Sequence, residues 1–341
     1  MNGSPAAKRR LLALLALLAV FAIACDTGPQ DFLKSQASVQ TQKADSLWDV
    51  TFAIAVFIFV VVEGLIIYAL IRFRQRPGRE AAQFHGNTKV EIILTVIPSL
   101  ILAGLAVPTV QTIFENSKQP PDALRIQVVA KQFWWEFNYP DLGIVTANEL
   151  HLPVDQTAYI EITSPTNDVI HSFWVPRLTG AQDAVPGRTN TTVITPTATG
   201  QFWGQCKEFC GLSHSRMRLR VFVEDRSTFD QWVADQGEEA AEPTDSLAQQ
   251  GQELFVNGQC AACHTISGTN AAGTTGPNLT HLMSRRTFAG AIFRMNEGNL
   301  RDWVADAPAM KPGSIMPSGL KSMGLSQSDV DAIVAYLLTL E

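Results

Sequence analysis

The chain has 341 residues and a formal net charge of −6, which is long enough for two or three domains. Its basic residues form no long block, so the sequence does not indicate a nucleic-acid-binding protein. Eighteen Phe and seven Trp, with a slightly positive mean hydropathy, favour a membrane protein with soluble parts.

The first 24 residues have the pattern of an export signal peptide. Basic residues at positions 8–10 precede an apolar stretch, and Ala22-Ile23-Ala24 has the form of a cleavage site. Cleavage there would leave Cys25 as the new N-terminus, which resembles the start of a lipoprotein. A plain signal peptide with an unmodified Cys25 is the alternative. Residues 25–46 are then expected to form an extracytoplasmic linker.

Two apolar spans, residues 51–71 and 92–114, predict a transmembrane helix hairpin over residues 47–115. At about 1.5 Å per residue, each span is long enough for a hydrocarbon core of about 30 Å. The connection between them is short and rich in arginine, and such a connection belongs on the cytoplasmic side. The chain before and after the hairpin is therefore expected outside the cytoplasm, in agreement with the signal peptide.

Two acidic residues belong to these spans. Glu63 precedes Arg72 by nine residues, so it would lie about 13 Å deep, near the membrane midplane. An ionisable group at that depth is functional or pairs with a neighbouring subunit. Glu91 begins the second span, where the helix dipole alone would favour an acidic residue.

Residues 120–236 predict an all-β sandwich or barrel that is closed by a short helix. Short segments rich in aromatic and β-branched residues alternate with turn residues. The closing segment, "STFDQWVADQ", places Phe229, Trp232 and Val233 on one helix face. The polar, acidic stretch 237–246 is predicted to be a linker. From residue 247 to residue 341 the pattern becomes helical.

Cys260-Ala-Ala-Cys263-His264 has the spacing of a c-type haem attachment site. The two thioethers would hold the porphyrin edge, and His264 would bind the iron. Together with the flanking segments "GQELFVNGQ", "TTGPNL" and "KPGSIMP", this motif resembles a class I cytochrome c over residues 247–341.

The resemblance implies an all-α domain with Met316 as the sixth iron ligand, and Met310 is the rival candidate. It also implies that the carbonyl of Pro277 steadies His264 and that Trp303 packs near a haem propionate. Histidine and methionine as axial ligands raise the reduction potential of the iron, which suits electron transfer.

Residues 206–217, "CKEFCGLSHSRM", contain two cysteines, a histidine and a methionine. A disulfide would leave the histidine and the methionine unexplained, and zinc has no use for a thioether. Copper binds thiolate, imidazole and a weak methionine, but a blue-copper site needs only one cysteine. Two thiolates can bridge two metal ions, which calls for a second imidazole that His171 can supply. In the following strand Met217 alternates with Arg216, Arg218 and Arg220, so Met217 is expected to point inward and the arginines outward.

The same loop, with "DVIHSFWVPRLTGAQDAVPGR" and "KVEIILTVIPSLIL", resembles cytochrome c oxidase subunit II over nearly the whole mature chain. The resemblance implies a cupredoxin domain of Greek-key topology with a binuclear copper centre (CuA), behind two transmembrane helices. The implied ligands are the side chains of His171, Cys206, Cys210, His214 and Met217 and the backbone carbonyl of Glu208. The Glu208 side chain would also meet a magnesium ion at the contact with subunit I.

Two further roles are implied by the same resemblance. "KQFWWEFNYP" matches the aromatic stretch through which the family takes electrons from cytochrome c, with Phe133 where the family usually has its first Trp. Trp134 is therefore the candidate for the electron path, and packing within the sheet is the alternative for Phe133. Glu91 matches the mouth of a proton pathway into subunit I.

Together these features predict a prokaryotic multi-pass plasma-membrane protein with two periplasmic domains, namely subunit II of a haem–copper terminal oxidase. Electrons would pass from haem c to the coppers and on to subunit I, where O2 is reduced to water with proton translocation, so no residue of this chain is expected to be catalytic. The expected partners are subunits I and III, membrane lipid, and cytochrome c or a quinol–cytochrome c reductase as donor. The alternatives are the copper subunit of a membrane nitric oxide reductase and a stand-alone membrane-anchored electron carrier.

Overall fold

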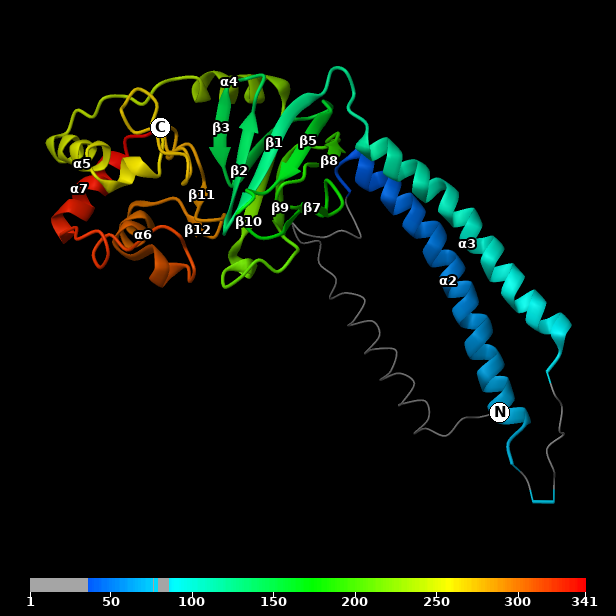
Figure 1. Cartoon of the computed structure of the whole chain (residues 1–341). Coiled ribbons are helices and arrows are strands. Elements are labelled where there is room, and N and C mark those ends of the chain that lie inside the picture. Colours follow the sequence, from blue (N-terminus) through cyan, green and yellow to red (C-terminus); the bar gives the residue numbers. More distant parts are fainter. Residues whose placement is uncertain (1–35, 76, 79–85) are drawn as a thin grey trace, which may run out of the picture.

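The computed structural model describes residues 36–75, 77–78 and 86–341. The predicted signal peptide and Cys25 lie outside these residues. Two long helices extend from one end of a β-sandwich, and a small helical domain packs at the opposite end (Figure 1). The described parts of the chain therefore follow one another in space as they do in sequence.

The two long helices are α2 (Val39–Arg72) and α3 (Thr88–Ser117), and both are long and apolar enough to cross a membrane. Helix α2 begins twelve residues before the apolar span that predicts it. The reason is a capping box, in which the Ser38 hydroxyl accepts from the Thr41 amide at 3.1 Å and the Thr41 hydroxyl accepts from the Ser38 amide at 3.3 Å. The polar first turns of α2 were expected to be part of a linker.

The start of α2 is fastened to the sandwich. The Val39 amide donates to the Thr195 carbonyl at 3.0 Å, and the Thr197 amide donates to the Ala37 carbonyl at 2.8 Å. The hydroxyl of Ser38 also donates to the Leu178 carbonyl at 2.6 Å. These bonds fix the direction in which α2 leaves the β domain. We call residues 37–39 and their partners the α2 anchor.

The β domain described here is a sandwich of two five-stranded sheets. The pairs β1–β5 and β4–β10 are parallel, and the other pairs are antiparallel. In order across the first sheet the strands are β3 (Ile144–Ala147), β2 (Trp134–Tyr139), β1 (Leu124–Lys131), β5 (Ala158–Thr163) and β8 (Asn190–Ile194). Across the second sheet they are β4 (Glu149–Pro153), β10 (Arg218–Glu224), β9 (Gly200–Cys206), β6 (His171–Trp174) and β7 (Gln182–Ala184).

The core of the sandwich follows from the alternation along its strands. In β1 and β2, buried residues alternate strictly with half-buried ones, as expected when one face of a sheet covers a core. The predicted all-β domain is confirmed. Helix α4 (Arg226–Gln236) closes it with Phe229 buried and with Trp232 and Val233 packed against the core, as its sequence pattern predicts.

The C-terminal domain is built from three helices, α5 (Ser246–Val256), α6 (Glu297–Met310) and α7 (Gln327–Leu337), with a short hairpin of β11 (Thr287–Phe288) and β12 (Phe293–Arg294). Helices α5 and α7 cross closely at Gly251, where a Cβ would lie 1.9 Å from the Ala332 carbonyl oxygen. Only glycine permits this approach. The predicted helical domain is confirmed.

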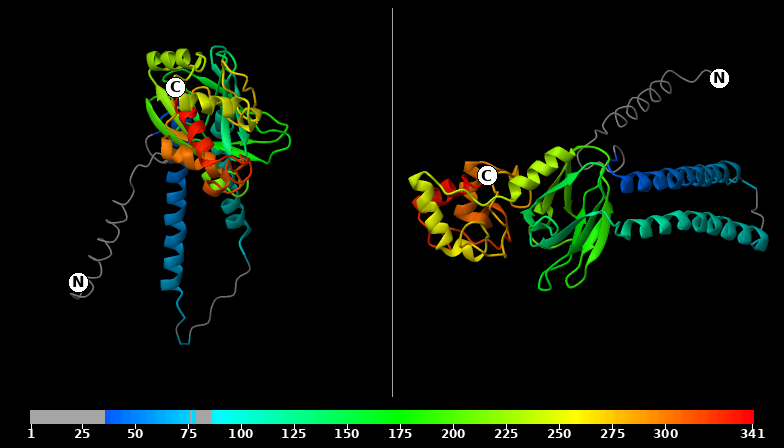
Figure 2. Two further views of the ribbon diagram at one scale, coloured as in Figure 1. Left: turned by 90° about the vertical axis from the view of Figure 1, so that its left-hand side faces the viewer. Right: turned by 90° about the horizontal axis from the view of Figure 1, so that it is seen from above.

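The face of β10 that carries Arg220 is opposite the sandwich core, as predicted, but it is not exposed. The alternation places Arg220 on an outward face, yet only 7% of Arg220 is exposed. The C-terminal domain covers this face, and the Arg220 guanidinium donates to the Ala291 carbonyl at 3.2 Å while lying 4.0 Å from the Trp203 ring centroid. The views in Figure 2 also show the helical domain packed against the sandwich. A strand of this sandwich is therefore covered on both faces.

Candidate copper and haem sites

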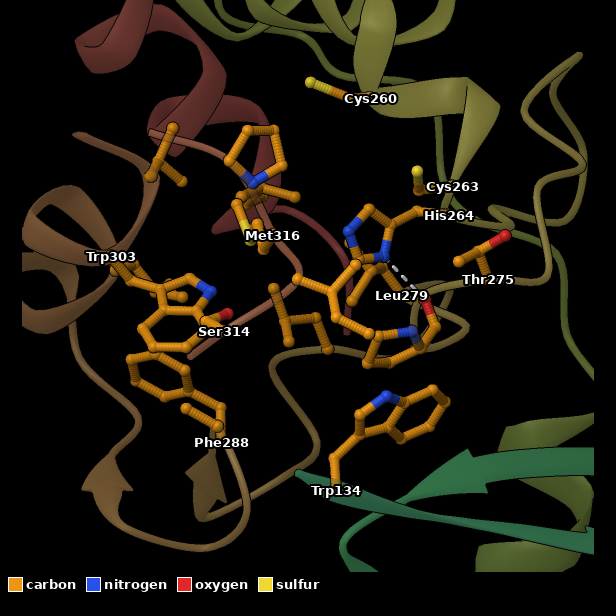
Figure 3. Close-up of a pocket in the computed structure, with 18 of the residues that line it drawn as sticks. Trp134, Cys260, Cys263, His264, Thr275, Leu279, Phe288, Trp303, Ser314 and Met316 are labelled. Atoms are coloured by element: carbon orange, nitrogen blue, oxygen red, sulfur yellow. Dashed lines mark hydrogen bonds between the residues drawn. The ribbon is translucent and has the colours of Figure 1, made fainter. Parts of the chain in front are cut away.

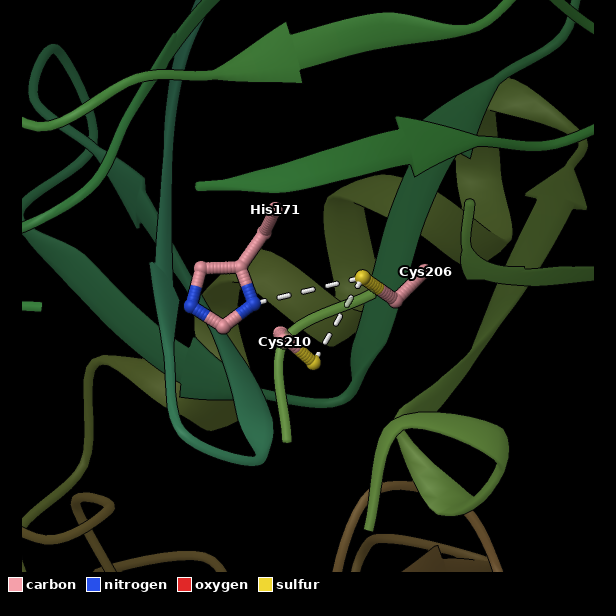
Figure 4. Close-up of side chains that lie close together, drawn as sticks. All are labelled: His171, Cys206 and Cys210. Carbon is pink, nitrogen blue, oxygen red and sulfur yellow. Dashed lines mark hydrogen bonds between the residues drawn. The ribbon is translucent and has the colours of Figure 1, made fainter. Parts of the chain in front are cut away.

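The predicted copper ligands come together at one end of the sandwich. His171 begins β6, Cys206 ends β9, and the loop that follows contains Cys210 and the 3₁₀ turn η1 (His214–Arg216). Cys206 Sγ lies 3.9 Å from both His171 Nδ1 and Cys210 Sγ (Figure 4). Cys206 Sγ also lies 3.1 Å from the carbonyl oxygen of Glu208.

The second sulfur completes the group. Cys210 Sγ lies 3.7 Å from His214 Nδ1 and 3.8 Å from Met217 Sδ. Met217 is fully buried, as its position in the strand pattern predicts. The other four groups that the sequence nominates therefore surround the two cysteine sulfur atoms.

The donor set suits copper. Cys206 and Cys210 are free thiols, so the disulfide alternative does not describe this structure. The hydrogen bond between the two sulfurs lowers the pKa of Cys206 and raises the pKa of Cys210, because the pair shares one proton. The Cys206 thiol therefore ionises more readily than an ordinary cysteine, which favours metal binding. Soft sulfur beside imidazole nitrogen is the combination that copper prefers.

Asp168 is a further residue of this site, and the sequence analysis missed it. His171 Nε2 lies 3.2 Å from Asp168 Oδ1. A carboxylate only accepts, so Nε2 carries the proton and Nδ1 presents its lone pair toward Cys206. The other Asp168 oxygen accepts from the Gln132 amide at 3.1 Å. An acidic residue three positions before a ligand histidine was the only signal in the sequence.

Residues of the turn between β1 and β2 contact the copper loop, which is the segment of residues 206–217. Gln132 Nε2 donates to the Cys210 carbonyl at 2.5 Å. Phe133 is 5% exposed, and a Cβ at Gly211 would lie 3.1 Å from its ring. Gly211 has φ of +126°, a conformation that other residues rarely adopt. The turn therefore holds the loop from the side of the C-terminal domain.

The predicted haem residues line a single, mostly apolar cavity of about 430 Å³ in the C-terminal domain. Cys260, Cys263, His264 and Met316 all border it (Figure 3). A cavity in the range of about 300–1,000 Å³ is typical of cofactor sites. Two thiols beside a histidine and an opposing methionine provide the attachment and ligation that a c-type haem requires.

A hydrogen bond to the Pro277 carbonyl fixes the orientation of the His264 ring. Its Nδ1 lies 2.8 Å from the Pro277 carbonyl, which can only accept, so Nδ1 carries the proton and Nε2 keeps its lone pair. Burial lowers the pKa of His264, which favours the neutral ring that binds a metal. A Cβ at Gly276 would lie 2.6 Å from His264 Cε1, so glycine leaves the space that the ring needs.

Of the two methionine candidates, Met316 borders the cavity. Met310 ends α6, and its carbonyl accepts from the Arg216 guanidinium at 2.8 Å, at the contact with the β domain. Trp303 also borders the cavity and packs edge-on against Phe288, with ring centroids 5.8 Å apart. The cavity thus brings together the residues that the cytochrome c resemblance implies.

The other nominated residues lie apart, with one exception. Trp134 belongs to β2 of the sandwich, yet it borders the haem cavity (Figure 3). The Glu208 side chain, within the copper loop, is exposed. Glu63 lies within α2, and Glu91 lies in the first turn of α3. Both lie on the transmembrane helices and border neither site, so their roles stay predictions.

Two membrane-spanning helices, a β-sandwich with copper-type donors and a helical domain with a haem motif define a membrane-anchored fusion of a cupredoxin-like and a cytochrome c-like domain. The family models for the transmembrane and periplasmic domains of cytochrome c oxidase subunit II match residues 27–112 and 142–224. The family model for cytochrome c matches residues 248–341.

Individual relatives agree with these matches. The chain is 36% identical over 290 residues to cytochrome c oxidase subunit 2 of Alkalihalophilus pseudofirmus, covering 83% of this chain and 82% of the relative. It is 33% identical over 353 residues to the Bacillus subtilis protein of the same name, covering 96% of each. The chain belongs to the cytochrome c oxidase subunit II family.

Among solved structures, the periplasmic domain of subunit II of the Bradyrhizobium japonicum cytochrome oxidase is 32% identical. It covers 34% of this chain and 95% of that one, with a TM-score of 0.33. Family membership confirms the predicted resemblance, and it implies copper in the periplasmic domain and haem in the cytochrome c domain. The protein is therefore a membrane-bound component of a haem–copper oxidase.

Proposed function

We propose that this chain is the electron-accepting subunit of a haem–copper terminal oxidase. Its cytochrome c domain takes up electrons, its copper domain passes them to subunit I, and O2 is reduced to water there. One observation carries this proposal. Two consecutive residues of the copper domain connect the two sites. Trp134 borders the haem cavity, and Phe133 packs against the copper loop.

The copper ions would be held by His171, Cys206, Cys210, His214 and Met217, with the Glu208 carbonyl as the sixth group. The distances of 3.1–3.9 Å around the two sulfurs support this assignment. Asp168 holds the His171 ring so that Nδ1 faces the sulfurs. His171 and Met217 are fully buried, so the sandwich shields this side of the site from water.

The haem would be held covalently by Cys260 and Cys263, and His264 and Met316 would bind its iron. The apolar cavity that all four border supports this assignment. Bound in these two sites, haem and copper supply one-electron redox chemistry. Pro277 orients the imidazole, and the apolar walls keep water from the site.

The remaining roles concern the assembly. Trp134 would lie on the electron path, the exposed Glu208 carboxylate would meet magnesium at subunit I, and Glu91 would open a proton pathway. Subunit III, lipid, and cytochrome c or a quinol–cytochrome c reductase complete the expected partners in a prokaryotic plasma membrane. The domain bounds we propose are residues 47–115 for the hairpin, 120–236 for the copper domain and 247–341 for the cytochrome domain.

The test is to purify the complex that contains this chain in mild detergent, count haem c, other haem and copper, and assay O2 and nitric oxide uptake. We expect one haem c and two coppers per chain, further haem in a partner subunit, and O2 uptake. The variant Met316→Leu should abolish O2 uptake and leave the copper content unchanged. The control Met295→Leu, a partly buried residue packed against the domain core, should retain O2 uptake. Nitric oxide uptake in place of O2 uptake, or isolation of a lone chain, would contradict the proposal.

A further inference from the structure

Each of the two soluble domains contributes one buried charged side chain that forms hydrogen bonds with the other domain. Glu149, the first residue of β4 in the copper domain, is 2% exposed. Its carboxylate accepts from the Arg286 amide at 3.1 Å, from the Thr287 amide at 2.8 Å and from the Thr287 hydroxyl at 2.6 Å. Arg286 and Thr287 belong to the cytochrome domain, so the Glu149 carboxylate forms these hydrogen bonds with the neighbouring domain.

Lys311 crosses the boundary in the opposite direction. It follows α6, is 3% exposed, and belongs to the cytochrome domain. Its ammonium donates to the Phe133 carbonyl of the copper domain at 2.6 Å and to the Ala289 carbonyl at 2.8 Å. Burial lowers the pKa of Lys311 to about 7. The contact survives deprotonation, because a neutral amine still has two N–H groups for the two carbonyls.

A continuous seam joins these two contacts. The Arg218 amide of β10 donates to the Gly290 carbonyl at 3.0 Å, and the Ser213 hydroxyl donates to the Pro312 carbonyl at 2.6 Å. Gly290 has φ of +78°, and a Cβ there would lie 2.6 Å from Lys311 Nζ and 3.0 Å from the Phe133 carbonyl oxygen. The backbones of the two domains therefore approach as closely as a glycine allows.

Buried charges are costly unless their hydrogen bonds are complete. Any other docked arrangement that covers this surface would bury Glu149 and Lys311 without these partners. A domain that swung free on linker 237–246 would have to remove water from both groups at every return. Each hydrogen bond to a charged group shifts an equilibrium by about 10- to 100-fold. Both side chains thus favour one docked arrangement.

We propose that Glu149 and Lys311 are positioning residues that hold the cytochrome domain on the copper domain in a single orientation throughout turnover. Electron transfer between the two sites then needs no docking step. This inference rests on the proposed function, since it concerns how the same transfer is arranged. It adds that the haem cavity keeps Trp134 as a permanent wall.

The experiment compares Glu149→Gln and Lys311→Met in the intact, haem- and copper-loaded complex. The matched controls are Glu161→Gln, in the half-exposed pair with Arg125 on the same domain, and Lys321→Met, an exposed lysine of the cytochrome domain. Hydrogen exchange is followed for the peptide containing Arg286 and Thr287. We expect exchange there to rise about 10- to 100-fold in the two test variants and to stay unchanged in the controls.

The second readout is the rate of electron transfer from photoreduced haem to copper in buffers of rising viscosity. The unmodified complex should show one phase that viscosity does not change, and the test variants should gain a slower phase that viscosity retards. Intact haem and copper absorption verifies that each variant is folded. Should Glu149→Gln fail to assemble, Thr287→Val removes a single donor and leaves the carboxylate in place.

The outcomes separate the two proposals. A viscosity-dependent rate in the unmodified complex, or wild-type exchange in every test variant, overturns the single docked orientation and leaves the proposed function standing. Absence of any haem-to-copper transfer in the unmodified, fully loaded complex overturns the proposed function itself. Faster exchange together with the slow phase supports the positioning role.

Discussion

The copper site and the haem site are built in opposite ways. Five of the six proposed copper groups come from twelve consecutive residues, and their donor atoms lie within 4 Å of one of two sulfurs. The haem cavity is bordered by segments spread from residue 132 to residue 337, including part of the copper domain. A small ion can be held by one loop, whereas a large planar group needs walls that only distant segments supply.

This contrast predicts that single changes act most severely at the copper site. Cys210→Ser removes one of the two sulfurs that all other donors surround, so we expect loss of copper and of O2 uptake, with haem c retained. Metal analysis and the haem absorption spectrum would check both parts. Ser215→Ala, an exposed change in the same loop, is the control. Copper retained at two ions per chain in Cys210→Ser would refute the bridging role.

Asp168→Asn tests whether the copper loop depends on support from outside itself. The amide can still occupy the space, but it no longer presents only acceptors to His171 Nε2. Loss of such a supporting partner lowers metal affinity by about 10- to 100-fold. Copper titration against a competing chelator would measure this. Unchanged affinity would mean that the sulfurs alone orient His171.

Gly276→Ala makes the corresponding test at the haem site. The new methyl group would lie 2.6 Å from His264 Cε1, so either the ring or the backbone must move, at a cost of about 1–3 kcal/mol. We expect a lower thermal unfolding temperature and an altered haem absorption spectrum. Gly298→Ala, in helix α6, where the nearest atom would be 3.6 Å away, should leave the haem spectrum unchanged and should not lower the unfolding temperature. Equal behaviour of both variants would argue against a rigid His264.

The smallest effect is expected for Trp134→Ala, which opens the wall that the copper domain contributes to the haem cavity. Greater access of water stabilises the more highly charged oxidised haem, so its reduction potential should fall by an amount on the order of tens of millivolts. A redox titration of haem c in the intact complex would measure the shift. Tyr159→Ala, a half-buried change on the same sheet, should leave the potential unchanged.

The sequence was most informative where the chemistry is local. The copper donors, the haem motif and the helical spans each occupy one short stretch, so spacing and composition suffice to nominate them. Met217 was expected to face inward because a strand alternates, and it is buried.

The features that the sequence did not predict depend on residues far apart in the chain. Glu149 meets partners 137 and 138 positions away, and Lys311 meets Phe133 across 178 positions. Alternation in β10 indicates which face its own sheet buries, but it carries no signal that a second domain covers Arg220. Burial between domains is a property of their packing, and no local pattern encodes it.

The α2 anchor has a consequence for the order in which the protein folds. Val39 opens the first membrane helix, yet its backbone partner Thr195 is made more than 150 residues later. During synthesis the membrane hairpin must therefore be inserted while its outer end is still unattached, and the anchor closes only after the strands through β8 have been exported. The direction in which α2 leaves the copper domain is thus set by a strand that is translated long after the helix itself.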